Sequence, residues 1–240
     1  MNRFSWRAWR FSFLVLAALA PAAFAASIAV DVGHYHEAPG ATSARGVPEF
    51  EYNLRLAREI AEALRRRGHE TRLIGDDGLA SDLYGRAPRA AGMDLLISIH
   101  HDSVQAHFLW EWVYEGATRY EADGFSGYSV FVSRRNSRAA ESLKCASAIG
   151  REMRRAGFKP SCYHADPVLG ESRPFADEVN GVHYFDNLVV LRAASIPALL
   201  FEAGVIVNRE EELRLRDPVM RSRMAAAIAF GADDCLRRAP

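Results

Sequence analysis

The sequence lacks several features that would indicate particular classes of protein. Its 30 basic residues balance 30 acidic residues among 240, so nothing favours a nucleic-acid-binding face. It has no internal repeat, low-complexity tract or linker-like segment, and no apolar run beyond the N-terminus is long enough to cross a bilayer. These absences favour a single folded domain with no transmembrane segment in the mature chain.

Cysteine is scarce, and the three residues present are Cys145, Cys162 and Cys235. Their spacing suits no structural zinc site. In an oxidising compartment an odd number leaves at least one thiol over. A bridge from Cys145 to Cys162 is only just within reach if a helix runs to about Gly157, and Cys235, near the end of the last helix, is an equal candidate partner. The pairing therefore stays open.

The N-terminus has the pattern of a secretory signal. Three arginines precede an apolar stretch over residues 11–19, and a small-residue cleavage pattern ends at Ala25. The apolar stretch is shorter than the roughly 20 residues that a spanning helix needs. We therefore expect a signal peptide over residues 1–25 and a mature domain over residues 26–240, located in the periplasm or secreted.

The rest of the chain alternates between short apolar runs and amphipathic segments. Apolar runs predict strands over residues 28–32, 70–74, 95–99, 128–132, 188–191 and 198–201. Helical spacing predicts helices over about 49–68, 81–91, 137–156 and 219–236, with a short one near Glu210. This order is typical of an α/β domain, whose mainly parallel sheet carries helices on both faces. The segments between His101 and Tyr128 and from Phe158 to Asp186 show no clear period.

Metal-binding side chains follow several of the predicted strands. His34, His100 and Glu202 each come just after an apolar run, and Glu49 opens the first helix. Because the carboxyl ends of parallel strands meet at one edge of a sheet, we expect these four groups to converge. Two imidazoles and one carboxylate are a ligand set of catalytic zinc, which keeps a fourth position for water. One carboxylate then remains free as a base, and the spacing alone does not say which.

Four phrases of the sequence resemble the motifs of a known family. They are Val30-Asp31-Val32-Gly33-His34, Glu49-Phe50-Glu51-Tyr52-Asn53-Leu54, Ser98-Ile99-His100 and Phe201-Glu202-Ala203-Gly204-Val205-Ile206-Val207-Asn208. In this order they look like the zinc-dependent N-acetylmuramoyl-L-alanine amidases, often called amidase 3, over essentially the whole mature chain. The resemblance implies a six-stranded sheet, Zn²⁺ held by His34, Glu49 and His100, and Glu202 as the catalytic carboxylate. It selects Glu49 over Glu51, because the family's acidic ligand stands four residues before the Asn of an Asn-Leu pair.

The resemblance also implies a substrate and a reaction. The substrate is peptidoglycan, and the bond cleaved is the amide between N-acetylmuramic acid and L-alanine of the stem peptide. Zinc would polarise the carbonyl, and Glu202 would take a proton from water and pass it to the departing amine. The same four groups would also serve a zinc peptidase that cuts within the stem peptide, and a wall-binding protein with a degenerate site is a third interpretation. The sequence identifies no regulatory protein partner.

The chain departs from the family pattern beside two of the expected ligands. Glycines usually follow the first His, where this chain has Tyr35 and His36, and a small residue and Asn usually follow the last ligand, where it has His101 and Asp102. His101 is a candidate proton shuttle or oxyanion partner, or a support paired with Asp102. We expect His36, His101, Asp102 and Arg192 to support the ligands or to touch the substrate. The aromatic segment after His101 is expected to stack on sugar rings or to pack a long loop.

Overall fold

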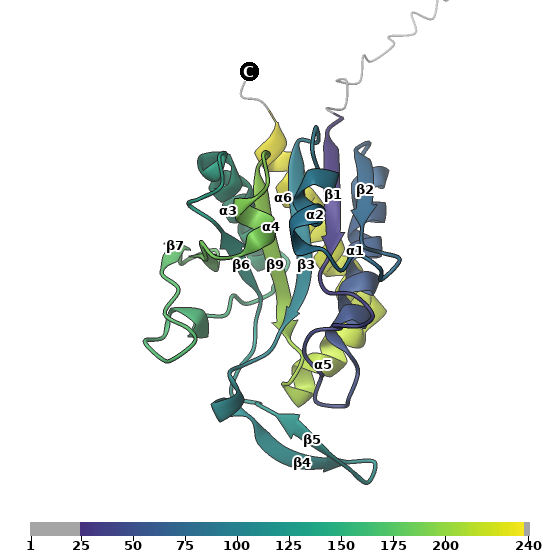
Figure 1. Ribbon diagram of the computed structural model, residues 1–240, viewed down its shortest axis with the longest axis vertical. Coiled ribbons are helices and arrows are strands. Elements are labelled where there is room, and N and C mark those ends of the chain that lie inside the picture. Colours follow the sequence, from purple (N-terminus) through teal and green to yellow (C-terminus); the bar gives the residue numbers. More distant parts are fainter. Residues whose placement is uncertain (1–24, 238–240) are drawn as a thin grey trace, which may run out of the picture.

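The computed structural model describes residues 25–237, and the expected signal peptide lies outside this part of the chain except for Ala25. Seven strands form the central sheet, in the order β2-β1-β3-β9-β6-β8-β7 (Figure 1). These strands are β1 (Ser27–Val32), β2 (Glu70–Ile74), β3 (Leu95–Asp102), β6 (Ser129–Val132), β7 (Phe175–Asp177), β8 (Val182–Tyr184) and β9 (Ala198–Val205). The helices are α1 (Glu49–Arg66), α2 (Leu83–Arg89), α3 (Ala139–Arg155), α4 (Val189–Arg192), α5 (Arg209–Arg216) and α6 (Pro218–Leu236).

The sheet is mixed but mainly parallel. Strand β1 runs parallel to β2 and β3, β3 runs parallel to β9, and β6 runs parallel to β8. The β6–β9 and β7–β8 pairs are antiparallel. The prediction of a single α/β domain with a mainly parallel sheet is confirmed. The sheet has seven strands and not six, because the short strands β7 and β8 form in a segment without a clear period and the strand expected over residues 188–191 is absent.

The strand expected over residues 188–191 is wrong, because this segment forms the one-turn helix α4. An apolar run of four residues fits either structure, and the surroundings decide. The side-chain amide of Asn136 donates to the carbonyl oxygens of Leu191 (2.7 Å) and Ala194 (3.3 Å). These bonds satisfy carbonyl groups that a helix end leaves free, so they stabilise a turn at this place.

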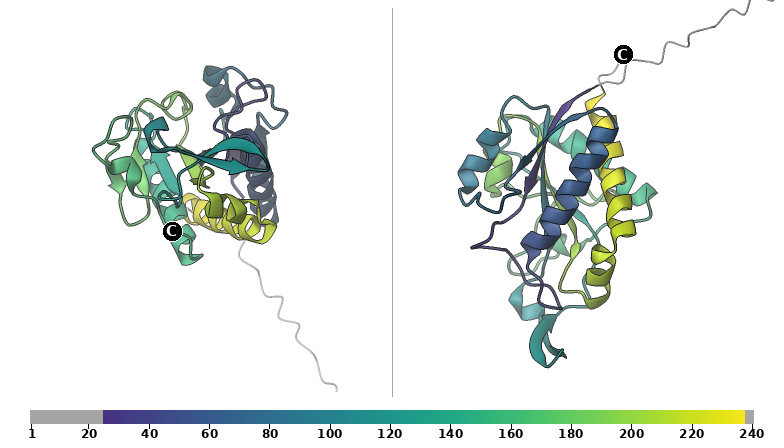
Figure 2. Two further views of the ribbon diagram at one scale, coloured as in Figure 1. Left: turned by 90° about the horizontal axis from the view of Figure 1, so that it is seen from below. Right: turned by 90° about the vertical axis from the view of Figure 1, so that its right-hand side faces the viewer.

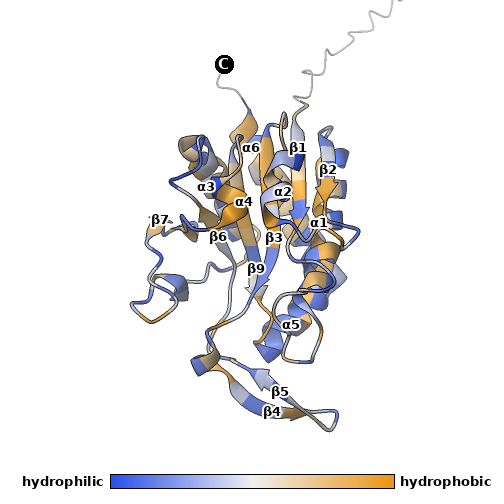
Figure 3. Cartoon of the chain, in the orientation of Figure 1, coloured by the Kyte–Doolittle hydropathy of each residue, from blue (hydrophilic) through white to orange (hydrophobic). Residues whose placement is uncertain are grey.

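Helices cover both faces of the sheet (Figure 2). One face packs against α1, α3 and α6, through buried side chains such as Leu56, Ile149 and Ile228. The other face packs against α2 and α4, through Ala87 and Leu191. The upper parts of the central strands are accordingly largely apolar, as is helix α4 on the covering face (Figure 3). Within residues 25–237, no helix combines the length and the apolar character that crossing a membrane requires.

Helix α1 is held in place by its apolar face. Leu56, Ile60 and Leu64 are fully buried against the sheet, and burying each such side chain stabilises the fold by roughly 1.5–3 kcal/mol. The helix begins at Glu49 and ends at Arg66, two residues before Gly68, which has the left-handed φ of 90°. The packing of α1 therefore fixes the position of Glu49 at its first turn.

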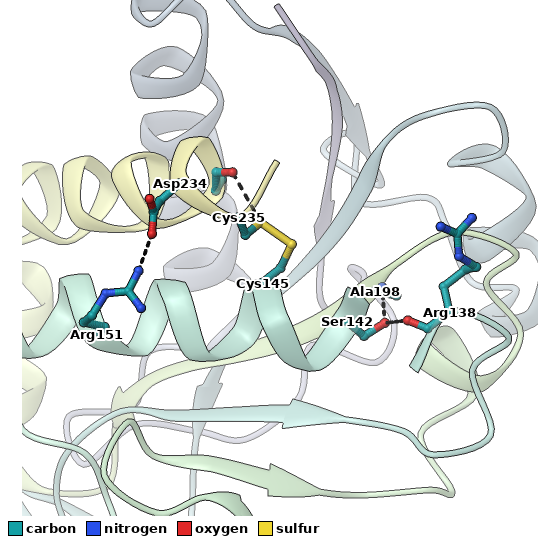
Figure 4. Close-up of a disulfide and its surroundings, with 8 residues drawn as sticks. Arg138, Ser142, Cys145, Arg151, Ala198, Asp234 and Cys235 are labelled. Carbon is teal, nitrogen blue, oxygen red and sulfur yellow. Dashed lines mark hydrogen bonds and ion pairs between the residues drawn. A yellow bond between two sulfur atoms is a disulfide. The ribbon is translucent and has the colours of Figure 1, made fainter. Parts of the chain in front are cut away.

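A disulfide joins α3 to α6. Cys145 and Cys235 are bonded, with their Cα atoms 4.9 Å apart (Figure 4). Gly231 allows this close approach, because a Cβ atom at this position would lie 2.5 Å from the Cα of Ile149. The third cysteine, Cys162, is exposed and free. Of the two pairings left open by the sequence, the structure contains the one between Cys145 and Cys235.

The aromatic segment after β3 contains a hairpin of two antiparallel strands, β4 (Trp110–Tyr114) and β5 (Ala117–Glu121). It projects from the carboxyl-end edge of the sheet, at the bottom of Figure 1. Trp112 packs inward, and its indole N–H donates to the carbonyl of Ala44 at 3.0 Å. Trp110, in contrast, is 72% exposed. Trp112 therefore packs this long segment against the domain, which is one of the two roles expected for the aromatic residues.

Candidate active site

Three metal-binding side chains converge beside the carboxyl ends of β1 and β3. His34, Glu49 and His100 each offer one ligand atom, and these atoms all lie within 4.8 Å of one another. Glu49 Oε2 is 3.0 Å from His34 Nε2, and Glu49 Oε1 is 3.1 Å from His100 Nδ1. The two imidazole rings meet edge to face, with their centroids 4.9 Å apart. The structure thus brings together the three groups that the resemblance implies as ligands.

Each of the three comes from a different kind of element. His34 lies two residues beyond β1, in the left-handed conformation (φ 68°). Glu49 is the first residue of α1. His100 lies within β3, which continues to Asp102 instead of ending before the histidine. Strands β1 and β3 are parallel neighbours, so the two histidines are delivered to the same edge of the sheet.

The carboxylate of Glu49 is buried and held by several donors. Its Oε1 accepts from the Asn53 side-chain amide (3.0 Å) and from the backbone N–H of His101 (3.3 Å), and its Oε2 accepts from the backbone N–H of Ala41 (3.1 Å). Burial alone would raise the pKa of Glu49, but hydrogen bonds from His100 and His34 outweigh burial and hold this pKa well below its ordinary value. The group therefore stays ionised, as a metal ligand must.

Two glycines leave room for this cluster. A Cβ atom at Gly33 would lie 2.4 Å from the ring of His100, and one at Gly40 would lie 2.3 Å from Glu49 Oε2. Gly40 also has a φ of 82°, which favours glycine. The donor set of two imidazoles and one carboxylate fits a divalent ion such as zinc, which binds nitrogen and oxygen ligands in this combination.

Glu202 lies beside the cluster on the neighbouring strand. It is in register with His100 across the parallel β3–β9 pair, so both side chains point to the same face of the sheet. Glu202 is partly exposed, yet its Oε2 is buried and has no hydrogen-bond partner within residues 25–237. Burial, and then the negative charges of Asp102 and Glu49, raise the pKa of Glu202 well above its ordinary value. This carboxylate is outside the cluster and available for proton transfer.

His101 and Asp102 do not pair as expected, because successive residues of a strand point to opposite faces. His101 is 1% exposed, and its Nδ1 lies 2.8 Å from the Asn53 side-chain oxygen. Burial lowers the pKa of His101 to about 3, so its ring is neutral. Asp102 Oδ2 instead accepts from the Tyr163 hydroxyl (2.5 Å) and from His164 Nε2 (2.8 Å). His101 contributes to the cluster through its backbone N–H.

His164 belongs to a buried polar network that ties residues 163–173 to the end of β3. Its Nδ1 lies 2.8 Å from Glu171 Oε2, and Glu171 also pairs with Arg173. Burial would lower the pKa of His164, but the carboxylates of Asp102 and Glu171 outweigh burial and raise it. Sequence reasoning noted His164 only as part of an irregular stretch. No local pattern could have predicted its partner Asp102, which lies 62 positions away.

The remaining candidates lie outside the cluster. His36 is exposed, and its ring packs on Phe50 with centroids 5.0 Å apart. Arg192 lies on α4, where its Nη2 is 3.3 Å from the Tyr84 hydroxyl. Glu51 faces solvent and pairs with Arg55 at 2.7 Å, so of the two early acidic residues only Glu49 joins the cluster. Asn53 was used in the sequence only to locate Glu49, whereas in the structure it holds both Glu49 and His101.

Comparisons with known proteins agree with this geometry. The family described as N-acetylmuramoyl-L-alanine amidase matches residues 28–234. The chain is 27% identical to N-acetylmuramoyl-L-alanine amidase AmiA of Escherichia coli over 85% of its length and 74% of that protein. It is 27% identical to AmiC of Neisseria meningitidis, of which it spans 51%.

Solved structures show the same fold. The amidase Ami1 from Mycobacterium smegmatis superposes with a TM-score of 0.69 at 20% identity, covering 88% of this chain and 96% of that one. The catalytic domain of CwlV, from Bacillus (Paenibacillus) polymyxa var. colistinus, superposes with a TM-score of 0.65 at 22% identity, covering 87% and 97%. The aligned region includes nearly all of the domain described above.

Proposed function

Because its match over residues 28–234 shows that the chain belongs to the N-acetylmuramoyl-L-alanine amidase family, we infer that it is an enzyme of cell-wall hydrolysis. It is a peptidoglycan hydrolase that cleaves the amide bond between N-acetylmuramic acid and L-alanine of the stem peptide. The observation that carries this assignment is the convergence of His34, Glu49 and His100, with Glu202 free on the paired strand.

We propose that the three-residue cluster holds Zn²⁺. Two imidazole nitrogens and a carboxylate satisfy the ligand preference of this ion and leave a fourth position open. When bound, zinc supplies a Lewis acid for the scissile carbonyl and makes a water molecule more acidic. The amide of Asn53 and two backbone N–H groups donate to the carboxylate oxygens of Glu49 and so hold this group in position for metal binding.

Glu202 has the role of general base and then general acid. Its raised pKa reflects a carboxylate that takes up a proton readily, and its Oε2 has no partner within the described chain to compete for that proton. It accepts a proton from the attacking water and donates it to the nitrogen of L-alanine as the amide bond breaks. The amine then leaves in its neutral form, and the lactyl group becomes a carboxylic acid, which loses the remaining proton of the water to solvent.

The location that fits this activity is outside the cytoplasm. The disulfide between Cys145 and Cys235 supports this proposal, because such bonds persist in oxidising compartments. We propose that residues 1–25 direct export and that the mature domain acts in the periplasm or as a secreted protein.

The decisive experiment identifies the products released from purified peptidoglycan by the chain over residues 26–240. An amidase releases stem peptides that begin at L-alanine and leaves intact glycan strands, and a zinc chelator stops the release. Glu202→Gln should keep one zinc per chain but lower turnover by about 10²- to 10⁴-fold, the usual contribution of a general acid–base residue.

Glu51→Gln is the matched control, since this exposed glutamate lies two residues after Glu49 and outside the cluster. It should keep both zinc and activity. Cleavage inside the stem peptide would instead identify a zinc peptidase. A wild-type chain that holds no zinc and releases nothing would indicate a wall-binding protein with a degenerate site.

A further inference from the structure

A buried arginine lies beneath the loop that carries His34. Arg86, on α2, is 2% exposed. Its Nη1 donates to Asp31 Oδ1 (2.8 Å) and to the carbonyl oxygen of Val32. Its Nη2 donates to the carbonyl oxygens of Ala80 (2.8 Å) and His34 (2.5 Å). One guanidinium therefore holds the two carbonyl groups on either side of Gly33.

These two carbonyl groups fix an unusual backbone conformation. His34 has a φ of 68°, and residues other than glycine pay roughly 1–2 kcal/mol to adopt this left-handed region. Such a conformation persists only where the surroundings determine it. In this backbone conformation the His34 ring reaches Glu49, with Nε2 at 3.0 Å from Oε2. The contacts of Arg86 are therefore placed where they set the position of a cluster residue.

The charge of Arg86 is balanced by one carboxylate, that of Asp31, which a hydroxyl of the neighbouring strand holds in place. Asp31 lies on β1, is 1% exposed, and accepts from the Ser98 hydroxyl of β3 at 2.6 Å. A buried ion pair is expensive to desolvate and is often no more stabilising than apolar side chains of the same size. Packing of α2 on the sheet needs no charge, as the neighbouring Ala87 illustrates. We therefore explain the buried Arg86–Asp31 pair by the backbone carbonyl groups that Arg86 binds, those of Val32 and His34.

We propose that Arg86 is a positioning residue, which sets the orientation of His34 for metal binding through the backbone carbonyls of Val32 and His34. Asp31 and Ser98 orient the guanidinium in turn. This inference rests on the proposed function of His34 as a metal ligand. The planar fork of arginine is essential, because a lysine ammonium keeps the charge but cannot grip several separate acceptors in a fixed plane.

The experiment compares Arg86→Lys with the milder Ser98→Ala. Zinc affinity is measured by competition with a chelating dye, the visible spectrum of the Co²⁺-loaded protein reports ligand geometry, and urea unfolding of the metal-free protein reports stability. We expect Arg86→Lys to weaken zinc affinity about 10- to 100-fold, as loss of a group that orients a ligand does. Its Co²⁺ spectrum should shift as well. Ser98→Ala should weaken affinity measurably, by about 2- to 10-fold, in keeping with the net contribution of one typical hydrogen bond.

Arg67→Lys is the matched control. Arg67 pairs with Asp233 between α1 and α6, so this variant disturbs a partly buried ion pair away from the metal cluster. It should lower stability and leave zinc affinity and the Co²⁺ spectrum unchanged. A merely structural Arg86 would behave in the same way as this control.

The outcomes separate this inference from the proposed function. If the wild-type chain binds no zinc, the proposed function is wrong. If the wild type binds zinc and folded Arg86→Lys binds it equally well, the positioning role is overturned. Should Arg86→Lys fail to fold, Ser98→Ala decides, because the loss of one hydroxyl leaves the packing intact. Unchanged zinc affinity and an unchanged Co²⁺ spectrum in Ser98→Ala would then overturn the proposal.

Discussion

Two glutamates of the same site have opposite surroundings. Glu49 accepts hydrogen bonds from an amide and two backbone N–H groups and faces two imidazoles, which hold its pKa well below the ordinary value despite its burial. Glu202 has a buried oxygen without a partner in the described chain, and burial and nearby carboxylates raise its pKa. One group is therefore held as an anion, and the other favours the uptake of a proton.

This contrast supports the two proposed roles, which residue type alone does not distinguish. Carboxylates whose environments separate their pKa values can work at one pH as a permanent charge and as a proton carrier. The position of each group in the fold explains the difference. Glu49 begins a helix and accepts from the backbone N–H groups of Ala41 and His101, whereas Glu202 lies within a strand whose backbone groups are already paired.

The largest expected effect comes from removing the anion. Glu49→Gln replaces one ligand of the cluster by a neutral amide that binds metal poorly, so we expect the chain to lose zinc. Turnover should fall by at least the 10²- to 10⁴-fold expected for Glu202→Gln, since removal of a general base costs about that much while the metal is still present. Metal analysis after dialysis, together with product release from peptidoglycan, measures both effects. A Glu49→Gln chain that retains one zinc would break the distinction between the two glutamates.

A smaller effect is expected when the support of Glu49 is removed and the ligand is kept. Asn53→Ala deletes the amide that donates to Glu49 Oε1 at 3.0 Å and to the Gly33 carbonyl at 3.2 Å. We expect zinc affinity to fall about 10- to 100-fold, as is usual for partners of metal ligands. With saturating zinc, kcat should return close to the wild-type value because Glu202 is unchanged. A permanent loss of kcat would show that Asn53 acts on the reaction itself.

The pKa values of Glu49 and Glu202 can also be compared directly by titration. In the metal-free protein, ¹³C-labelled glutamate carboxyl groups are titrated by NMR, and the Glu49→Gln and Glu202→Gln variants assign the two signals. Glu202 should titrate above the ordinary glutamate pKa, because of burial and the charges of Asp102 and Glu49, and Glu49 should titrate below it. The opposite order would invert the proposed roles.

The smallest effect concerns the network beside Glu202. The pKa of His164 is raised in the folded state, so its contribution to stability is fully present below the unfolded pKa of about 6.5 and is lost as pH rises through the folded pKa. His164→Gln should therefore lower the free energy of unfolding most at mildly acidic pH, by about 1–3 kcal/mol. Urea unfolding across pH compares the two chains. A difference that grows toward alkaline pH would contradict the charged state of His164.

The parts of the fold that follow local periodicity were predictable from the sequence. The alternation of buried strands and amphipathic helices gave the α/β class, and helix α1 begins at Glu49 as expected. Helix α4 and the β4–β5 hairpin were missed because runs of four or five residues fit several structures, and the final choice depends on partners such as Asn136. The suggested pairing of His101 with Asp102 was wrong because successive side chains of a strand point to opposite faces of the sheet. His101 contacts Asn53 instead.

The supports of the site were beyond sequence reasoning for a related reason. His34, Glu49, His100 and Glu202 carry recognisable chemistry directly after apolar runs or at the start of a helical pattern. Arg86 and His164, in contrast, look like ordinary residues until their distant partners are known. The bonds of Arg86 to Asp31 and of His164 to Asp102 connect positions 55 and 62 residues apart. Such contacts are products of the topology, not of any local motif.

The covalent link between α3 and α6 has a practical consequence for anyone who prepares this protein. The disulfide closes a loop across a separation of 90 positions. In the chain-entropy model, a loop of that size lowers the entropy of the unfolded state and so raises the free energy of unfolding by about 4–5 kcal/mol. Material made in a reducing cytosol would lack this restraint and carry three thiols in place of one. Heat tolerance measured on such material would understate that of the native enzyme, so oxidative expression or refolding should come before any assay.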